Sequence, residues 1–177
     1  MKKNIVPLLA VILGLTLFGC GKSSVSDVTI ESFPAITTAM IRFTDSPMMN
    51  IPQNIDTIAK YLDEQNYFEN NPARVICVAW SWEKSRGDWG IGFIIDPNAG
   101  IEGTDEIEII DFPALEQAAT AVYTGPYIGI TKGYNAISTW IEDNGYEYCY
   151  PSFEEYLNDP SEVPASELET KIWTGIK

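Results

Sequence analysis

The sequence Phe33-Pro34-Ala35-Ile36 returns as Phe112-Pro113-Ala114-Leu115, 79 residues further along the chain. The same shift, without a gap, aligns Tyr61-Leu62-Asp63-Glu64 with Trp140-Ile141-Glu142-Asp143. Further pairs in this register are Ala39 with Ala118, Pro47 with Pro126, Ile51 with Ile130, Ile58 with Ile137, Tyr67 with Tyr146 and Pro72 with Pro151. Chance rarely keeps so many prolines and aromatic residues aligned, so the sequence indicates an internal repeat.

Both halves predict the same order of elements. An alternating stretch over residues 28–43, and again over 107–123, is divided by Phe-Pro into two short strands. A helix follows, marked by apolar residues at i, i+3 and i+7. These are Ile55, Ile58 and Leu62 after the start signals Asn50 and Pro52, and then Tyr134, Ile137 and Ile141 before Gly145, which can close the helix. Further strands are expected over 74–82, 90–95, 146–150 and 169–176, with loops over 83–89, 96–105 and 158–167.

One half alone is too small to bury a stable core. Two copies related by a pseudo-two-fold axis can share one sheet, and the cleft between them is a natural place for a ligand. We therefore predict an α+β domain over residues 28–177, made of two βαββ units at about 28–95 and 107–177. Its antiparallel sheet carries two main helices and a central cleft.

Composition excludes several classes of function. The chain has 177 residues, 45% of them hydrophobic, and its 11 basic and 25 acidic residues give a net charge of -14. Such a charge repels phosphate backbones, so no nucleic-acid partner is expected. The absence of histidine rules out Ser-His-Asp and Cys-His sites and any zinc site that needs imidazole. The acidic run 102–111 does not match an EF-hand, and no phosphate-binding loop is present, so we expect no metal and no cofactor.

The first twenty residues resemble a lipoprotein signal peptide. Lys2 and Lys3 precede an apolar run over residues 5–18, which is shorter than the roughly 20 residues of a membrane-spanning helix. The ending Leu17-Phe18-Gly19-Cys20 resembles the bacterial lipobox, in which the cysteine is acylated, for example with palmitate, and becomes the mature N-terminus. We expect residues 1–19 to be removed and 20–27 to form a tether. The chain would then be anchored to a bacterial membrane on its periplasmic or cell-surface side. An ordinary signal peptide or an uncleaved anchor remains the alternative.

Besides the acylated Cys20, two cysteines remain after that cleavage, Cys77 and Cys149. An exported protein can oxidise such a pair to a disulfide. Two buried thiols, packed as small apolar groups, are the other interpretation. Nothing in the sequence fixes their distance, so both interpretations stay open.

The second half carries a recognisable set of motifs: Tyr123-Thr124-Gly125-Pro126-Tyr127, Asn144-Gly145-Tyr146, Pro151-Ser152-Phe153-Glu154-Glu155-Tyr156-Leu157-Asn158-Asp159-Pro160 and Leu168-Glu169-Thr170-Lys171-Ile172. Over most of residues 28–177 the chain resembles the GyrI-like small-molecule-binding family, the effector-binding domain of AraC- and MerR-type regulators. This resemblance implies a duplicated βαββ unit and an aromatic pocket with an acidic residue inside. It also implies amphipathic, often cationic or aromatic, ligands. Some members of the family hydrolyse strained electrophilic rings with a pocket glutamate.

One feature departs from the family. The last strand reads Thr170-Lys171-Ile172 where many members have Thr-Glu-Ile. If Lys171 faced the pocket, an ammonium would replace a carboxylate there. No DNA-binding segment accompanies the domain, so we do not expect a direct role in transcription.

The candidate ligand-binding residues are mostly aromatic. Trp80 and Trp82 stand two apart on a predicted strand and share a face, although both could be core residues. Glu154 matches the family's glutamate, and Tyr156 shares its face if the segment is extended. An exposed position at a loop edge is the alternative for Glu154. The remaining candidates are Tyr123 two residues before the Gly-Pro-Tyr motif, Tyr127 and Tyr134 around the start of the second helix, and Lys171 with Trp173 on the last strand. Core packing is the alternative for Tyr134, and sheet packing is the alternative for Trp173.

Three functions compete. The first is a lipid-anchored protein that senses or sequesters an amphipathic small molecule. The second is a hydrolase in which Glu154 is the catalytic residue and activates water against an electrophile. The third is a domain that binds another envelope protein. The sequence leaves the ligand and the oligomeric state open.

Overall fold

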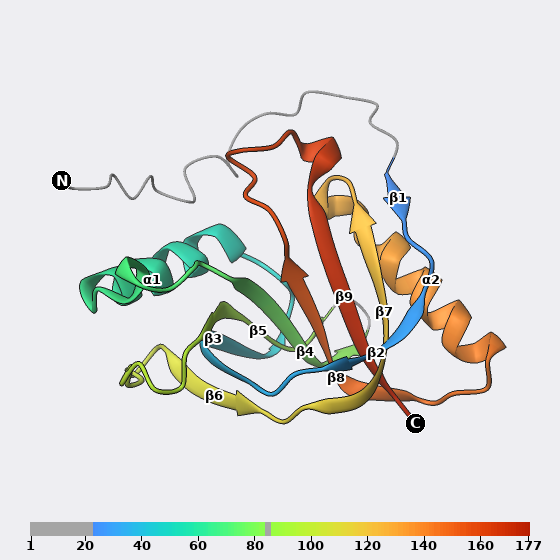
Figure 1. The fold of residues 1–177 in the computed structure, drawn as a ribbon, viewed down its shortest axis with the longest axis horizontal. Coiled ribbons are helices and arrows are strands. Elements are labelled where there is room, and N and C mark those ends of the chain that lie inside the picture. The colour runs from blue at the N-terminus through green and yellow to red at the C-terminus, as the bar shows by residue number, and fades with distance from the viewer. Residues whose placement is uncertain (1–22, 84–85) are drawn as a thin grey trace.

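The computed structural model describes residues 23–83 and 86–177, and its elements follow the predicted order (Figure 1). The first half contains β1 (Ser24–Val25), β2 (Thr29–Phe33), β3 (Ile36–Ser46), α1 (Ile51–Glu64), η1 (Tyr67–Glu69), β4 (Val75–Glu83) and β5 (Arg86–Ile95). The second contains β6 (Glu108–Phe112), β7 (Leu115–Thr124), η2 (Tyr127–Gly129), α2 (Thr131–Asp143), β8 (Tyr148–Tyr156), η3 (Ala165–Glu167) and β9 (Glu169–Ile176). The predicted α+β class with two main helices is confirmed.

All the described strands form one antiparallel sheet in the order β1-β7-β9-β8-β4-β5-β3-β6, with β2 also paired to β7. Outward from the central β4–β8 pair, the two sides present equivalent strands: β5, β3 and β6 on one side, and β9, β7 and β2 on the other. This order agrees with a duplicated unit. The pseudo-two-fold relation between the halves stays a prediction.

The two halves exchange their first strands. β2 of the first half pairs with β7, with Phe33 opposite Leu115, whereas β6 of the second half pairs with β3, with Phe112 opposite Ile36. The duplicated Phe-Pro segments thus cross from one half to the other. Neither half therefore completes its sheet without the other.

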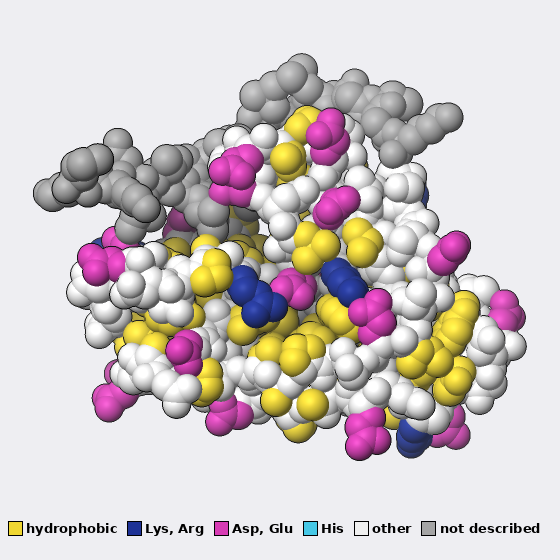
Figure 2. Space-filling view, in the orientation of Figure 1, with side chains coloured by type: hydrophobic (Ala, Val, Ile, Leu, Met, Phe, Trp, Pro, Cys, Tyr) yellow, Lys and Arg dark blue, Asp and Glu magenta, His cyan; other side chains and the backbone are white. Residues whose placement is uncertain are grey.

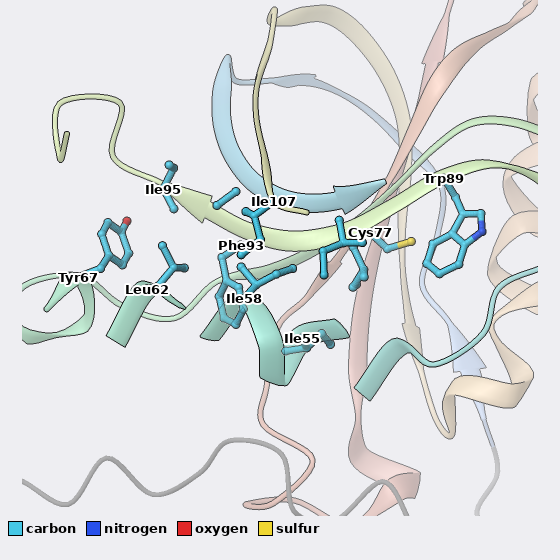
Figure 3. Packing of buried hydrophobic residues seen from close by; sticks show 12 residues of the cluster. Ile55, Ile58, Leu62, Tyr67, Cys77, Trp89, Phe93, Ile95 and Ile107 are labelled. Atoms are coloured by element: carbon cyan, nitrogen blue, oxygen red, sulfur yellow. The ribbon is translucent and has the colours of Figure 1, made fainter. Parts of the chain in front are cut away.

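Both helices pack on the same face of the sheet. Alternate residues of a strand point to opposite faces, so the residues that touch a helix define its side. In Figure 3, Ile55, Ile58 and Leu62 point from α1 toward strands that carry Cys77 and Phe93, and all five side chains belong to one buried cluster. Ile137 and Ile141 of α2 pack in the same way on β7 and β9. The predicted core positions are confirmed for Ile55, Ile58, Leu62, Ile137 and Ile141, whereas Tyr134 is only half-buried.

The opposite face of the sheet has a core of its own. Phe33 and Phe112 lie on the exchanged strands β2 and β6. Their side chains pack there with Phe153 and Trp173. The rings of Phe33 and Phe153 stack with centroids 4.2 Å apart. This face is therefore closed by the molecule's own side chains, and the ligand site has to be sought on the helix face.

Two local expectations change, and the structure distinguishes between the two interpretations of the cysteines. β4 and β5 run through most of the segment 83–89 expected to be a loop. β8 reaches from Tyr148 to Tyr156, well beyond the predicted end at residue 150. Cys77 and Cys149 are free thiols, because the register sets Cys77 opposite Glu154 and Cys149 opposite Gly175.

The predicted signal peptide and residues 20–22 of the predicted tether lie outside the described residues. The rest of that segment, residues 23–27, is described, and its Ser24 and Val25 form a short strand paired with β7, so this part is not a free tether. Within residues 23–83 and 86–177, no helix has the length and apolar character needed to cross a bilayer.

Candidate functional site

A hollow of about 580 Å³ opens on the helix face, between the first turn of α1 and the segment that follows β8. Residues from both halves line it: Met48, Met49, Asn50, Ile51, Pro52, Ile55, Ala73 and Val75 from the first, and Tyr127, Tyr156, Leu157, Asn158, Asp159, Pro160 and Glu162 from the second. Most of these side chains are apolar or aromatic. A hollow of this size and lining suits a small amphipathic molecule.

Glu154 lies beside this hollow, buried on β8 with only 6% of its surface exposed. The Tyr134 hydroxyl donates a hydrogen bond to its Oε1 at 2.7 Å, and the Tyr156 hydroxyl donates to its Oε2 at 3.1 Å. Burial raises the pKa of the Glu154 carboxyl, while these two hydrogen bonds pull the pKa back down. The two phenols keep their protons, because burial and the neighbouring carboxylate raise the pKa values of Tyr134 and Tyr156 far above the usual one.

Tyr156 connects this buried carboxylate to the hollow. Its hydroxyl contacts Glu154, and its ring forms part of the lining, where it meets the ring of Tyr127 edge to face at 5.2 Å. A molecule in the hollow therefore faces the two phenol rings first, with the carboxylate behind them.

The charge of the hollow is uniformly acidic. Asp159 and Glu162 lie in its lining, and no basic side chain occurs among the described residues that form it. Burial and the nearby Asp159 raise the pKa of Tyr127 to about 12, so this phenol stays neutral. The face seen in Figure 2 is similar, since acidic side chains are scattered across it and basic ones are few. The site thus favours positive ligands.

Tyr127 is held in place by the Gly-Pro-Tyr turn. The hydroxyl of the buried Tyr123 donates a hydrogen bond to the Pro126 carbonyl oxygen at 2.9 Å. Gly125 has a φ of +143°, and a Cβ on Gly129 would lie 2.1 Å from the Tyr123 hydroxyl oxygen. A residue with a side chain at position 125 or 129 would be strained or would clash, so only glycines allow this close contact between the turn and the Tyr123 ring. Tyr123 therefore supports the site from beneath and does not line it.

The family of the chain follows from the comparison of its sequence with known families. Residues 26–177 match the model of the GyrI-like small molecule binding domain. The chain belongs to the GyrI-like family. No curated protein sequence matches this GyrI-like chain.

Solved structures share the fold at low sequence identity. The C-terminal domain of EcmrR has a TM-score of 0.66 at 16% identity, covering 85% of this GyrI-like chain and 97% of that one. A hydrolase from Listeria innocua reaches 0.60 at 10% identity, with 85% and 92% covered. SAV2435, solved with tetraphenylphosphonium bound, reaches 0.57 at 14% identity, with 86% and 94% covered. At these identities the likeness shows the fold alone.

The structure brings together four of the predicted site residues of this GyrI-like domain. Tyr127, Tyr134, Glu154 and Tyr156 form one connected group. The alternative of an exposed Glu154 at a loop edge is wrong. Tyr134 binds the carboxylate although its repeat partner Ile55 is a core residue, because its longer side chain reaches β8.

The remaining candidates lie elsewhere in the domain. Trp80 and Trp173 pack with the core of the opposite sheet face. Lys171 shares that face, where its ammonium pairs with Glu31 at 3.0 Å and lies 4.1 Å from the Trp173 ring centre. The replacement of the family's glutamate by Lys171 therefore puts no cation into the hollow.

Trp82 is separated from Trp80 by a register shift in β4. The shift lies between Ala79 and Ser81, so simple alternation no longer relates the two indoles. Trp82 is 40% exposed.

Sequence reasoning missed the part of the lining formed by the start of α1 and the residues just before it, which we call the α1 wall. Met48, Ile51 and Ile55 line the hollow, and the repeat register contained a signal for this, since Met48 aligns with Tyr127. It also missed Asn158, which fixes the segment after β8. The Asn158 amide donates to the Glu167 carbonyl at 2.9 Å, and its Oδ1 accepts from the Glu169 N–H at 3.0 Å.

Proposed function

We propose that this chain captures an amphipathic organic cation in the hollow between α1 and the segment after β8. The observation that carries the proposal is the connected group of Tyr127, Tyr156 and Glu154, in which two phenol rings face an acidic, mostly apolar hollow and a buried carboxylate lies behind them. SAV2435, which shares this fold, has been solved with the lipophilic cation tetraphenylphosphonium bound.

Two kinds of interaction contribute to binding in this proposal. Apolar groups of the ligand leave water against Met48, Ile51 and Ile55, and each buried methylene contributes about 0.8 kcal/mol. The positive charge lies against the phenol faces of Tyr127 and Tyr156, where a cation–π contact contributes about 0.5–2 kcal/mol. The carboxylates nearby add an attraction that a neutral or anionic ligand does not receive.

A titration with ions of one shape and opposite charge tests this proposal. Tetraphenylphosphonium should bind and raise the melting temperature, whereas tetraphenylborate, which has the same shape and a negative charge, should do neither. Tyr127→Ala should weaken binding of the phosphonium, and the matched control Tyr150→Ala, at an exposed tyrosine of β8, should not. Equal binding of both ions, or binding of neither, would refute the proposal.

A hydrolase is the second candidate, favoured by the buried Glu154 whose pKa is raised. In that function the carboxylate would take a proton from a water whose oxygen attacks a carbon of an epoxide. The ring C–O bond would break, and the proton would pass from the carboxyl group to the ring oxygen. Turnover of an epoxide by the wild type that disappears in Glu154→Gln would support it. The present geometry favours binding, because both carboxylate oxygens already accept hydrogen bonds from tyrosines.

We also propose that the chain acts outside the cytoplasm, attached to a membrane through lipid on Cys20. The lipobox-like ending Leu17-Phe18-Gly19-Cys20 supports this. In cells, the wild type should fractionate with membranes and incorporate labelled palmitate, and Cys20→Ala should lose both properties. A wild type without label would refute the anchor and leave the ligand proposal standing.

A further inference from the structure

The N-terminal end of the described chain is fastened beside the hollow. Ser24 and Val25 pair with Thr124 and Tyr123 at the end of β7. The Lys132 ammonium donates to the Ser23 hydroxyl oxygen at 2.6 Å. The chain therefore enters the domain where the Gly-Pro-Tyr turn begins, close to the Tyr127 that lines the hollow.

Three of the seven exposed large hydrophobic side chains among the described residues line the hollow or follow directly on a lining residue. Ile128 follows Tyr127 in η2 and is 94% exposed, while Met49 and Leu157 line the hollow and are 56% and 44% exposed. We call these three residues the apolar rim. Large apolar side chains that stay in water next to a hollow mark a surface that meets something apolar.

The short distance between Ser23 and Cys20 indicates what this surface contacts. Only three residue steps separate Ser23 from Cys20. A fully extended chain covers at most ~3.3–3.6 Å per residue, so Ser23 lies within about 11 Å of an acylated Cys20. The polar layer of a bilayer is itself about 5–8 Å deep on each side. The β7 end of the domain would thus be held against the lipid headgroups.

We propose that the apolar rim of Met49, Ile128 and Leu157 docks on the bilayer surface, so that the hollow takes its ligand from the lipid phase. This proposal rests on the lipid anchor and the ligand site proposed above. Amphipathic cations concentrate in membranes. When the opening of the hollow lies at the level of the headgroups, such a cation can enter it directly from the membrane without first passing into water. The acidic residues Asp159 and Glu162 of the lining favour the cationic ones.

Fluorescence quenching by lipid measures the docking directly. The acylated full chain is placed in phosphatidylcholine vesicles with an environment-sensitive fluorophore at Ile128→Cys, in a Cys149→Ser background. The remaining Cys77 is buried. The matched control carries the label at Asn98→Cys, in the exposed turn after β5, which lies at the other end of the molecule from β1 (Figure 1). A third variant has a long Gly-Ser linker inserted between Lys22 and Ser23.

If the rim docks, lipids brominated near the headgroup should quench the label at position 128 several-fold more than the label at position 98. In the variant with the Gly-Ser linker, most of this difference in quenching should disappear. Equal or absent quenching at 128, in protein that floats with the vesicles, would overturn the docking and leave the anchor intact. Protein that does not float would overturn both. A label at 128 that is shielded equally in detergent, in protein that sediments as a dimer, would show a second copy as the occupant and overturn the docking. Tetraphenylphosphonium titrated into the same samples reports on the ligand site separately.

Discussion

The buried carboxylate of Glu154 lowers the free energy of unfolding, and the same side chain belongs to the candidate ligand site. Burial raises the pKa of its carboxyl above the usual 4.5. Between pH 4.5 and the raised value, the folded protein holds more protons than the unfolded chain, so this group makes stability fall as the pH rises through that window. Tyr134 and Tyr156 limit the loss by donating to the carboxylate.

A pH series tests this effect of Glu154. The free energy of unfolding of the wild type should fall, relative to that of Glu154→Gln, as the pH rises from 4.5 toward neutrality. Urea denaturation at each pH measures the difference. Glu116→Gln, at an exposed position on β7, should follow the wild type at every pH. Parallel curves for the wild type and Glu154→Gln would show that the buried carboxyl titrates normally.

Tyr123 provides a second test at the scale of the residue. Tyr123→Phe removes the hydrogen bond to the Pro126 carbonyl and so loosens the turn that places Tyr127. One hydrogen bond contributes about 1 kcal/mol, which corresponds to roughly fivefold weaker binding of tetraphenylphosphonium. Calorimetric titration measures the affinity. Tyr146→Phe, whose ring stacks on Trp140 away from the hollow, is the control and should bind as the wild type does. An unchanged affinity in Tyr123→Phe would show that the turn holds its shape without this bond.

The exchanged strands β2 and β6 couple the two halves of the domain, so we expect the halves to unfold together. Phe33 on β2 belongs to the first half by sequence, but it is 2% exposed and packs on Phe153 and Trp173 of the second half. Phe33→Ala should lower the free energy of unfolding by about 3–5 kcal/mol. Because β2 connects the halves, unfolding should remain a single transition, seen alike by tryptophan fluorescence and circular dichroism.

The control for Phe33→Ala is Ile30→Ala, on the same strand and 39% exposed, which should change stability much less. Two separate transitions in Phe33→Ala would mean that the halves hold together without the exchange.

The elements also show what the sequence could predict. The repeat and the i, i+3, i+7 spacing identified both helices and their buried residues, because one apolar stripe per helix decides which side faces the sheet. The family motif identified Glu154 and Tyr156. Spacing alone could not show whether Trp80 and Trp173 line the hollow. The hollow lies on the face that the helices cover, and the exchanged strands pack on the other face, where both tryptophans lie. Asn158 and the α1 wall were missed because the hollow joins segments that are distant in sequence.

At the scale of the whole molecule, the net charge of -14 should attract cations over a distance. The affinity for tetraphenylphosphonium should therefore fall as salt is raised, since ions screen charges beyond about 10 Å at roughly 0.1 M. Titrations over a range of sodium chloride concentrations measure the slope. Asp159→Asn combined with Glu162→Gln should flatten it, and the exposed Glu116→Gln should not. An affinity independent of salt would leave the ligand's apolar groups as the source of binding.

Locating a bound cation in a crystal tests the ligand site most directly. Tetraphenylarsonium has the shape and charge of the phosphonium, and its arsenic can be found by anomalous scattering. We expect one strong peak in the hollow, between the rings of Tyr127 and Tyr156 and the α1 wall at Met48. A peak on the opposite sheet face beside Trp80, or no peak at saturating concentration, would contradict the proposed site.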